Sequence, residues 1–220
     1  MMPTKEEWIQ ALKDRHGSML QEKIASKTVA VCGLGGLGSN IAIALARAGI
    51  GKLILIDFDR VDITNLHRQQ YKVNQIGMRK TEALRCNLKE INPYLETKLH
   101  TTRLDESNAM DMLSDADIIC EAFDNAECKA MLTNFVLENM PDKYLVAASG
   151  MAGLESGNAI HTRKISKRFY LCGDEVSDAK DGIGLVSTRV MLCAAHQAHM
   201  VLRMIANRFE EQKEGNTNGK

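Results

Sequence analysis

The sequence predicts an α/β fold: a doubly wound, mostly parallel Rossmann-like sheet with helices on both faces. Short apolar runs alternate with stretches of helical spacing as far as residue 149, which is the pattern of a parallel sheet. A glycine-rich turn separates the first apolar run from the helix that follows it. The chain has 220 residues, of which 45% are hydrophobic and 25% charged, and this suits one compact domain with a sizeable core.

Each element is expected from its own pattern. A helical arm, residues 1–26, precedes the sheet, with its helix at Thr4–Ala25. The runs "TVAVC" and "KLILID" are short enough for strands, and "LGSNIAIALARAG" between them has helical spacing and ends on glycine. The remaining elements expected in this part are helices at 79–91, 106–113 and 125–139 and strands at 95–100, 116–123 and 143–149.

The alternation changes after residue 149. The segments "AIHTRKI" and "KRFYLCG" predict two consecutive strands, so a few antiparallel strands are expected in the C-terminal part. A loop rich in Gly and Asp follows at 173–184, and a long helix then closes a nucleotide-binding domain expected at residues 27–209. The last stretch, 210–220, has the composition of a disordered tail.

Charge and cysteine usage argue against several classes of function. The chain has 28 Lys and Arg against 28 Asp and Glu, so no bulk field attracts nucleic acid or anionic lipid. A nucleic acid is therefore an unlikely partner, and no membrane is expected. The six cysteines form no CxxC pair and the N-terminal residues show no hydrophobic signal region, which indicates a reducing, cytoplasmic setting.

The glycine-rich turn predicts a nucleotide site. Gly33, Gly35 and Gly38 give the pattern GxGxxG, with Gly36 among them. Such glycines let the backbone approach a phosphate, and the N-terminus of the following helix supplies N–H groups and positive potential. Asp57 follows the last glycine by about 20 residues, which is the spacing of a carboxylate that binds a ribose.

The residues after Asp57 help to identify the nucleotide. The same strand, turn and acid also serve NAD-dependent dehydrogenases, but this chain continues with charged and amide side chains: Asp59, Asp62, Asn65, Arg68 and Gln69. Arginine and amide donors beyond the ribose site suit a triphosphate, whose charge must be neutralised during phosphoryl or nucleotidyl transfer. An NAD oxidoreductase is therefore the weakest interpretation.

Two further residues are expected at the same edge of the sheet. Lys80, at the start of the next predicted helix, can supply a second cation to the phosphates. Asp124 follows the fourth predicted strand and is placed to hold a magnesium ion, because parallel sheets bind ligands at the carboxyl ends of their strands. Together with Asp57 and Arg68, these residues predict a site for a nucleoside triphosphate and Mg²⁺.

These motifs resemble those of a known family. The segments "GLGGLGSN", "DFDRVDITNLHRQQY", "IGMRK" and "EAFDN" are similar to motifs of the ThiF/MoeB family, relatives of the ubiquitin-activating enzymes. The resemblance runs from about Arg15 through the last predicted helix and is strongest to a short ThiF-type branch associated with thiamine thiazole synthesis.

The resemblance implies an activity and a set of roles. A family member uses ATP and magnesium to adenylate the C-terminal glycine of a small ubiquitin-like sulfur carrier, which in the ThiF-type branch is ThiS. The roles implied here are ribose binding for Asp57, phosphate contacts for Asn65, Arg68 and Lys80, and magnesium binding for Asp124. The carrier carboxylate is already ionised at neutral pH, so positioning and charge stabilisation are expected to be the main contributions to catalysis.

The cysteines depart from the family pattern. Larger members bind zinc through two CxxC pairs, but the matching segment here reads "FYLC" and keeps only Cys172, so no zinc is expected. Some members also carry a loop cysteine that links covalently to the carrier, and "GDEVSDAKDGIGLVS" has none. Cys172 and Cys193 border this loop, but adenylation without an enzyme thioester is favoured.

Two alternatives within the same superfamily stay open. One is the activation of a carboxylate on a modified tRNA base, which would need a basic surface that the zero net charge does not indicate. The other is a non-catalytic partner of an activating enzyme, against which the retention of Arg68, Lys80 and Asp124 argues.

The arm ahead of the sheet also matters for function. The segment "LKDRHGSML" resembles the family arm that carries an arginine across a dimer interface. We therefore expect a symmetric homodimer in which Arg15 of one chain acts as an arginine finger at the ATP of the other.

Overall fold

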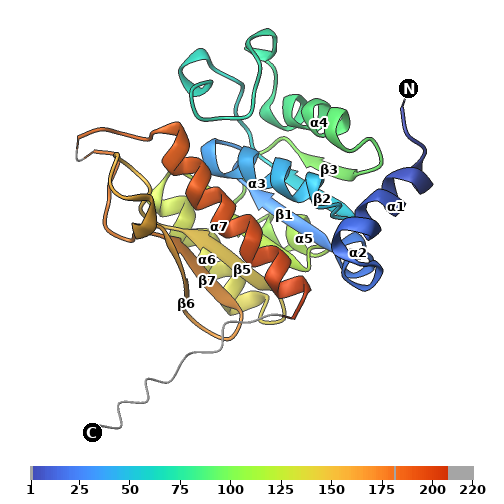
Figure 1. The fold of residues 1–220 in the computed structure, drawn as a ribbon. Coiled ribbons are helices and arrows are strands. Elements are labelled where there is room, and N and C mark those ends of the chain that lie inside the picture. The colour runs from blue at the N-terminus through green and yellow to red at the C-terminus, as the bar shows by residue number, and fades with distance from the viewer. Residues whose placement is uncertain (1, 181, 208–220) are drawn as a thin grey trace, which may run out of the picture.

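A seven-stranded sheet forms the centre of the protein in a computed structural model that describes residues 2–180 and 182–207 (Figure 1). The strands are β1 (Thr28–Cys32), β2 (Lys52–Ile56), β3 (Glu96–His100), β4 (Ile118–Glu121), β5 (Tyr144–Ala148), β6 (His161–Lys164) and β7 (Phe169–Gly173). They lie in the order β3-β2-β1-β4-β5-β7-β6. All neighbouring strands run parallel except β6, which is antiparallel to β7.

The described helices cover both faces of this sheet. They are α1 (Lys5–His16), α2 (Ser18–Ala25), α3 (Gly36–Arg47), α4 (Lys80–Ile91), α5 (Ala109–Leu113), α6 (Ala126–Asn139) and α7 (Ser187–Ile205). Side chains alternate along β1, so Val31 packs in the core under α3, α4 and α7, whereas Cys32 packs in the core under α5 and α6. Because both faces are covered, the central strands are almost entirely apolar, apart from Thr28 and Lys52 at the start of β1 and β2 and Glu121 at the end of β4. The predicted doubly wound fold is confirmed.

The N-terminal arm differs from the single helix predicted at Thr4–Ala25. It forms two helices, because Gly17 between them adopts φ 81°, a left-handed conformation that glycine reaches without strain. The Thr4 side chain caps α1, and α2 ends shortly before β1 begins. The arm is anchored at the amino ends of the strands, where Gln21 Nε2 donates to the carbonyl of Gly49 at 3.2 Å.

Other predicted boundaries shift by a few residues. The helix expected at 106–113 begins at Ala109, because Asp105 accepts hydrogen bonds from Ser107 and forms a turn ahead of it. The tail predicted at 210–220 lies outside the described residues.

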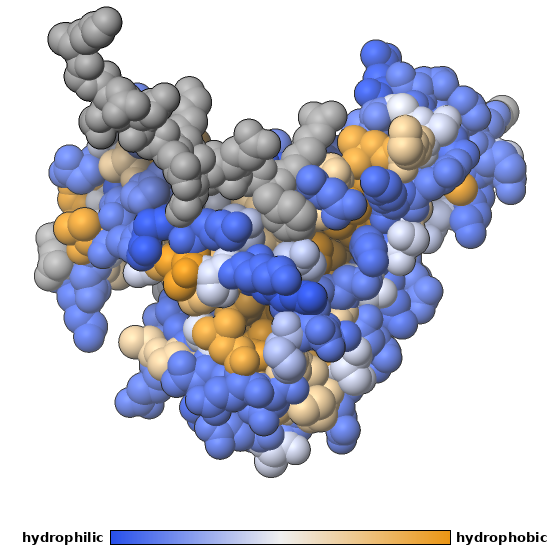
Figure 2. All heavy atoms as spheres, turned by 90° about the horizontal axis from the view of Figure 1, so that it is seen from below, coloured by the Kyte–Doolittle hydropathy of each residue, from blue (hydrophilic) through white to orange (hydrophobic). Residues whose placement is uncertain are grey.

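Figure 2 shows one face of the molecule, on which hydrophilic side chains predominate and hydrophobic ones form separate patches. Among the described helices, none is long and apolar enough to cross a membrane.

The strand order creates a crevice between β1 and β4. From β1 the chain proceeds outward to β2 and β3, and from β4 it proceeds outward in the opposite direction to β5. The crossover helices at this point therefore lie on opposite faces, which leaves an opening at the carboxyl ends of the two strands. In doubly wound sheets this opening is where ligands bind.

Candidate functional site

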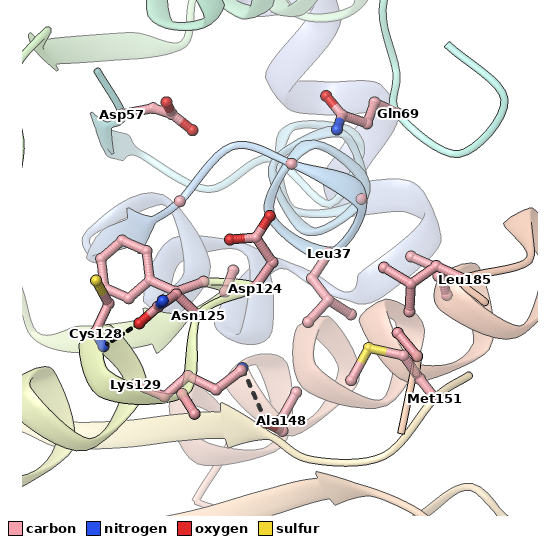
Figure 3. A pocket seen from close by; sticks show the side chains of 18 of the residues that line it. Leu37, Asp57, Gln69, Asp124, Asn125, Cys128, Lys129, Ala148, Met151 and Leu185 are labelled. Carbon is pink, nitrogen blue, oxygen red and sulfur yellow. Dashed lines mark hydrogen bonds between the residues drawn. The ribbon is translucent and has the colours of Figure 1, made fainter. Parts of the chain in front are cut away.

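A cavity of about 420 Å³ occupies this opening. Its walls come from the loops that follow β1, β2, β3, β4, β5 and β7, together with the first turns of α3, α4, α6 and α7. Nine of the residues predicted for the site line it: Gly33, Gly35, Gly36, Asp57, Asp59, Arg68, Gln69, Lys80 and Asp124. Residues separated by up to about 90 positions in sequence are thus brought to one place by the parallel sheet. Figure 3 shows Asp57, Gln69 and Asp124 around the cavity.

The glycine turn is packed too closely for side chains at two positions. Gly33 has φ 90°, and a Cβ atom there would lie 2.8 Å from the carbonyl oxygen of Ala122. Gly38 lies within α3 and is absent from the residues that line the cavity. A Cβ on Gly38 would lie 1.8 Å from the carbonyl oxygen of Gly33, so this glycine allows the helix to pack against the turn.

Asp57 is held by the turn that it faces. Its carboxylate is 8% exposed and accepts hydrogen bonds from the amides of Leu34 and Asp59, both at 2.7 Å. Burial raises the pKa of Asp57, and the nearby Lys80 ammonium opposes that rise. The oxygens keep lone pairs toward the cavity, so the residue can still accept hydrogen bonds from ribose hydroxyls.

Lys80 is a buried cation on the first turn of α4. It is 5% exposed, and its Nζ atom lies 2.8 Å from Asp59 Oδ2 and 3.9 Å from Asp57 Oδ2. The two carboxylates stabilise the ammonium in a buried setting that would otherwise disfavour its charge. The 2.8 Å bond to Asp59 uses one of its three protons, which leaves donors for an anionic ligand.

Arg68 and Gln69 present unpaired polar atoms to the cavity wall. Arg68 Nε and Gln69 Oε1 are buried and have no hydrogen-bond partner within the described part of the chain. Buried polar groups are normally paired, so atoms left free in a cavity wall are suited to a ligand. Asn65, predicted to contact phosphate, does not line the cavity; its carbonyl instead accepts the amides of Arg68 at 3.2 Å and Gln69 at 3.1 Å.

Asp124 lies in the loop between β4 and α6. Its side chain is exposed to the cavity and forms no hydrogen bond or ion pair with any described residue. The described residues contain no group of three His, Cys, Asp or Glu that could by itself hold a metal ion. A single free carboxylate nevertheless fits Mg²⁺, which usually binds through one or two carboxylates and the phosphates of its nucleotide.

The structure adds residues that the sequence did not single out. Arg103, Cys128 and Lys129 all line the cavity. Lys129 and Cys128 are on the first turns of α6, close behind the predicted Asp124, whereas Arg103 follows β3 and carries no motif. The available signal was the position of Arg103 just after a strand and of Cys128 and Lys129 just after Asp124, but polar residues at such places are common in any sequence.

The two cysteines considered for a covalent link are buried in the core. Cys172 and Cys193 have no exposed surface, and burial raises the pKa of the Cys193 thiol. A thiol buried in the core is inert, and a raised pKa also keeps Cys193 protonated, so neither residue has the environment of a reactive cysteine.

Arg15 is not part of the cavity of its own chain. It is exposed near the end of α1, and the arm packs at the amino ends of the strands, opposite the cavity. Any contact between Arg15 and a nucleotide would therefore have to involve a second chain.

Comparison with known proteins identifies the family. The model of the ThiF family matches residues 9–219, which is nearly the whole chain. The chain belongs to the ThiF family. This membership confirms the resemblance carried by the glycine turn and by the segments around Asp57, Lys80 and Asp124.

Relatives in this family carry several functions. The adenylyltransferase and sulfurtransferase MOCS3 of Caenorhabditis briggsae is 38% identical over 144 residues, 64% of this chain and 35% of that protein. The ubiquitin-like modifier-activating enzyme 5 of Caenorhabditis elegans is 40% identical over 119 residues, 49% of this chain and 28% of that protein. The matched regions thus span about a third of these relatives.

A solved structure matches the fold over its full length. The tRNA N6-threonylcarbamoyladenosine dehydratase TcdA of E. coli, in complex with ATP, superposes with a TM-score of 0.83 at 21% identity. The superposition covers 94% of this chain and 98% of that one. At this identity the match establishes the shared fold.

Proposed function

We propose that this protein is an ATP-dependent adenylyltransferase that activates the C-terminal glycine carboxylate of a small ubiquitin-like sulfur carrier. The observation that carries the proposal is the convergence of Asp57, Arg68, Lys80 and Asp124 on one cavity beside the glycine turn. Membership of the ThiF family supports the reaction class, and the named activities of the relatives support a small protein substrate. A ThiS-like carrier of thiamine thiazole synthesis is the specific partner that we propose.

The residues of this chain account for the steps of such a reaction. A carboxylate oxygen of the carrier attacks the α-phosphorus of ATP, the bond to pyrophosphate breaks, and an acyl adenylate forms. No side-chain base is needed, because a carboxylate is ionised at neutral pH. Asp57 holds the ribose and the glycine turn receives the phosphates, while Arg68 and Lys80 stabilise the negative charge that accumulates on the phosphoryl oxygens.

Asp124 is the residue that we propose to hold magnesium. A bound Mg²⁺ would neutralise phosphate charge that the two cations leave unbalanced. Its free carboxylate faces the same cavity as Lys80 and Arg68, which is the arrangement that this role requires.

The product of the reaction provides the test. The protein is incubated with ATP, Mg²⁺ and a ThiS-like carrier that ends in Gly-Gly, and the carrier is examined by mass spectrometry. We expect the mass of an adenylate on the carrier, and its absence when NAD replaces ATP. A carrier truncated by its last glycine is the matched control. Tight ATP binding without an adduct on any ThiS-like or MoaD-like carrier would exclude the proposed substrate.

Activation of a carboxylate on a modified tRNA base is the second candidate. The observation that favours it is the full-length match to the E. coli dehydratase, of which this chain covers 98%. An electrophoretic mobility shift with bulk tRNA distinguishes the two candidates. Binding of tRNA together with an unmodified carrier would favour the dehydratase, whereas an adenylated carrier without tRNA binding would favour the carrier enzyme.

A further inference from the structure

Two lysines line the cavity, but their donors are used differently. Lys129, on α6, donates from Nζ to Glu121 Oε1 at 3.0 Å, to Glu121 Oε2 at 2.9 Å and to the carbonyl of Ala148 at 3.0 Å. An ammonium group has three protons, and these three acceptors use them all. Lys129 therefore keeps no proton for a phosphate, unlike Lys80, whose ammonium donates only to Asp59 among the described residues.

Glu121 is the last residue of β4 and is 1% exposed. A carboxylate at such a position is costly to bury unless it is paired, and Lys129 provides the pairing charge. Glu121 also accepts the amide of Phe123 at 2.7 Å. From the opposite side, Gln197 of α7 donates to the carbonyl of Glu121 at 2.9 Å. The end of β4 is thereby fixed through both side chain and backbone.

These contacts hold both neighbours of Asp124. Phe123 is held through its amide by Glu121, and Asn125 caps α6 by accepting the amide of Cys128 at 3.0 Å. Asp124 lies between these two residues (Figure 3) and forms no hydrogen bond with the part of the chain that the structure describes. The position of Asp124 in the cavity is therefore determined by the backbone on either side of it. The Glu121–Lys129 ion pair holds the backbone on the Phe123 side.

We propose that Glu121 and Lys129 are positioning residues that orient Asp124 toward the metal of the bound nucleotide, without contacting the substrate themselves. The pair connects the ends of β4 and β5 to the first turn of α6, so that the intervening loop has one arrangement. This inference rests on the proposed function in one respect, because it takes Asp124 to be the magnesium ligand.

Metal binding tests the proposal without measuring turnover. Mn²⁺ is titrated into the protein saturated with a non-hydrolysable ATP analogue, and electron paramagnetic resonance measures how much of the Mn²⁺ is bound. Lys129→Met removes the charge and keeps the length of the side chain. We expect this variant to weaken Mn²⁺ binding by about tenfold or more, on the scale seen for residues that orient metal ligands. Lys129→Arg, which keeps the charge, should restore most of the affinity.

Two comparisons separate positioning from other roles. Affinity for the analogue in the absence of metal should be unchanged in Lys129→Met, because Lys129 has no donor left for phosphate. The matched control is Lys27→Met, which breaks a lysine–carboxylate pair with Asp117 at the opposite end of β4 and should leave Mn²⁺ binding unchanged. If Lys129→Met does not fold, Glu121→Gln keeps the side-chain shape and an acceptor for Phe123, and the same loss of Mn²⁺ affinity is expected.

The outcomes are distinguishable. Wild-type Mn²⁺ affinity in both folded Lys129→Met and Glu121→Gln would overturn the positioning role alone. An equal loss of metal-free nucleotide affinity would also overturn it, because it would show direct contact with the nucleotide. A wild-type protein that binds the analogue but no Mn²⁺ would instead remove the magnesium role of Asp124, and this inference with it.

Discussion

Arg68 and Lys80 contribute most where charge develops during the reaction. Lys80 is already paired with Asp59, and Arg68 keeps a buried Nε atom free, so both cations are in place before a nucleotide binds. Preorganised groups of this kind stabilise a transition state more than a ground state. We expect Arg68→Ala or Lys80→Ala to lower the rate of carrier adenylation by about two orders of magnitude. Single-turnover kinetics with radiolabelled ATP measures this rate directly.

The control for this prediction is Lys72→Ala. Lys72 is also paired with a carboxylate, Glu90, but it is half-exposed and lies outside the cavity lining. Its substitution should change the rate little, because a surface ion pair contributes about 1 kcal/mol or less to stability. Near-normal rates for the Arg68 and Lys80 variants would contradict the assignment of the site.

A second buried ion pair affects stability in acid. Asp174 pairs with Arg189, and the two side chains are 9% and 3% exposed. Burial acts to raise the pKa of Asp174, but hydrogen bonds from the amides of Ser177 and Val176, from the Ser177 hydroxyl and from Arg189 outweigh it and lower the pKa to about 2. An unfolded Asp has a pKa of about 3.9. Ionised Asp174 therefore stabilises the fold above about pH 4, and this contribution is lost as the pH falls toward 2.

Asp174→Asn tests this dependence. Removing one partner of a buried pair costs about 3–5 kcal/mol, so the free energy of unfolding at pH 7 should fall by that order. The difference between the wild type and the variant should shrink at pH 3, because the unfolded wild-type carboxylate, with a pKa of about 3.9, is then mostly protonated, whereas the folded one stays mostly ionised. Urea unfolding at the two pH values provides the comparison. A difference that stays constant with pH would show that the charge of Asp174 is not what stabilises the fold.

The residues of the site were predictable to the extent that the backbone alone places them. Asp57 and Asp124 follow strands, so the parallel sheet had to bring them to one edge. Asn65 is close in sequence to Arg68 and Gln69, which line the cavity, but Asn65 itself is not among the lining residues. The role of Lys129 was not predictable, because it depends on an ion pair with Glu121. In the sequence, Glu121 is only the last residue of an apolar strand, and nothing there indicates the pairing.

The glycine turn is the element whose packing is least tolerant of change. A Cβ at position 38 would approach the carbonyl oxygen of Gly33 to 1.8 Å, and that oxygen belongs to the backbone, so it cannot move aside as a flexible side chain could. Gly38→Ala should therefore displace α3 from the turn and cost about 1–3 kcal/mol of stability, as for other overpacked sites. ATP affinity should fall with it, and isothermal titration calorimetry measures that fall.

Gly184→Ala is the matched control for the turn. Gly184 has an ordinary φ, and a Cβ there would meet nothing closer than 3.8 Å. Both the stability and the ATP affinity of this variant should match the wild type. Equal behaviour of the two glycine variants would indicate that the turn adapts to a side chain.

At the level of elements, periodicity predicted most of the fold. Strands such as β1 and β2 are short apolar runs flanked by clear helices, so their parallel arrangement followed from the alternation. The break at Gly17 was not predicted, because a glycine inside a helical pattern can be either tolerated or terminating. The place of β7 beside β5 was also unpredictable, because it depends on contacts between segments distant in sequence.

At the scale of the whole molecule, the arm is the part of the chain for which we propose a role at the site of a second chain. Arg15 lies away from the cavity of its own chain and is exposed. We propose a symmetric homodimer in which the arm of each chain delivers Arg15 to the nucleotide of the other. The planar guanidinium is suited to phosphate oxygens, and its arrival from another chain would make it an arginine finger.

Symmetry allows this proposal to be tested by mixing inactive variants. In a heterodimer of Arg15→Ala with Arg68→Ala chains, one of the two sites combines an intact Arg68 with the intact Arg15 of its partner. We expect the mixture to recover adenylation well above either variant alone, up to about a quarter of the wild-type rate, because half of the dimers are mixed at equilibrium and each has one complete site of two. Two differently tagged chains show by co-purification that exchange has occurred. Exchange without recovery would mean that Arg15 does not act at the nucleotide of a partner chain, and the arm would then be a structural support for the amino ends of the strands.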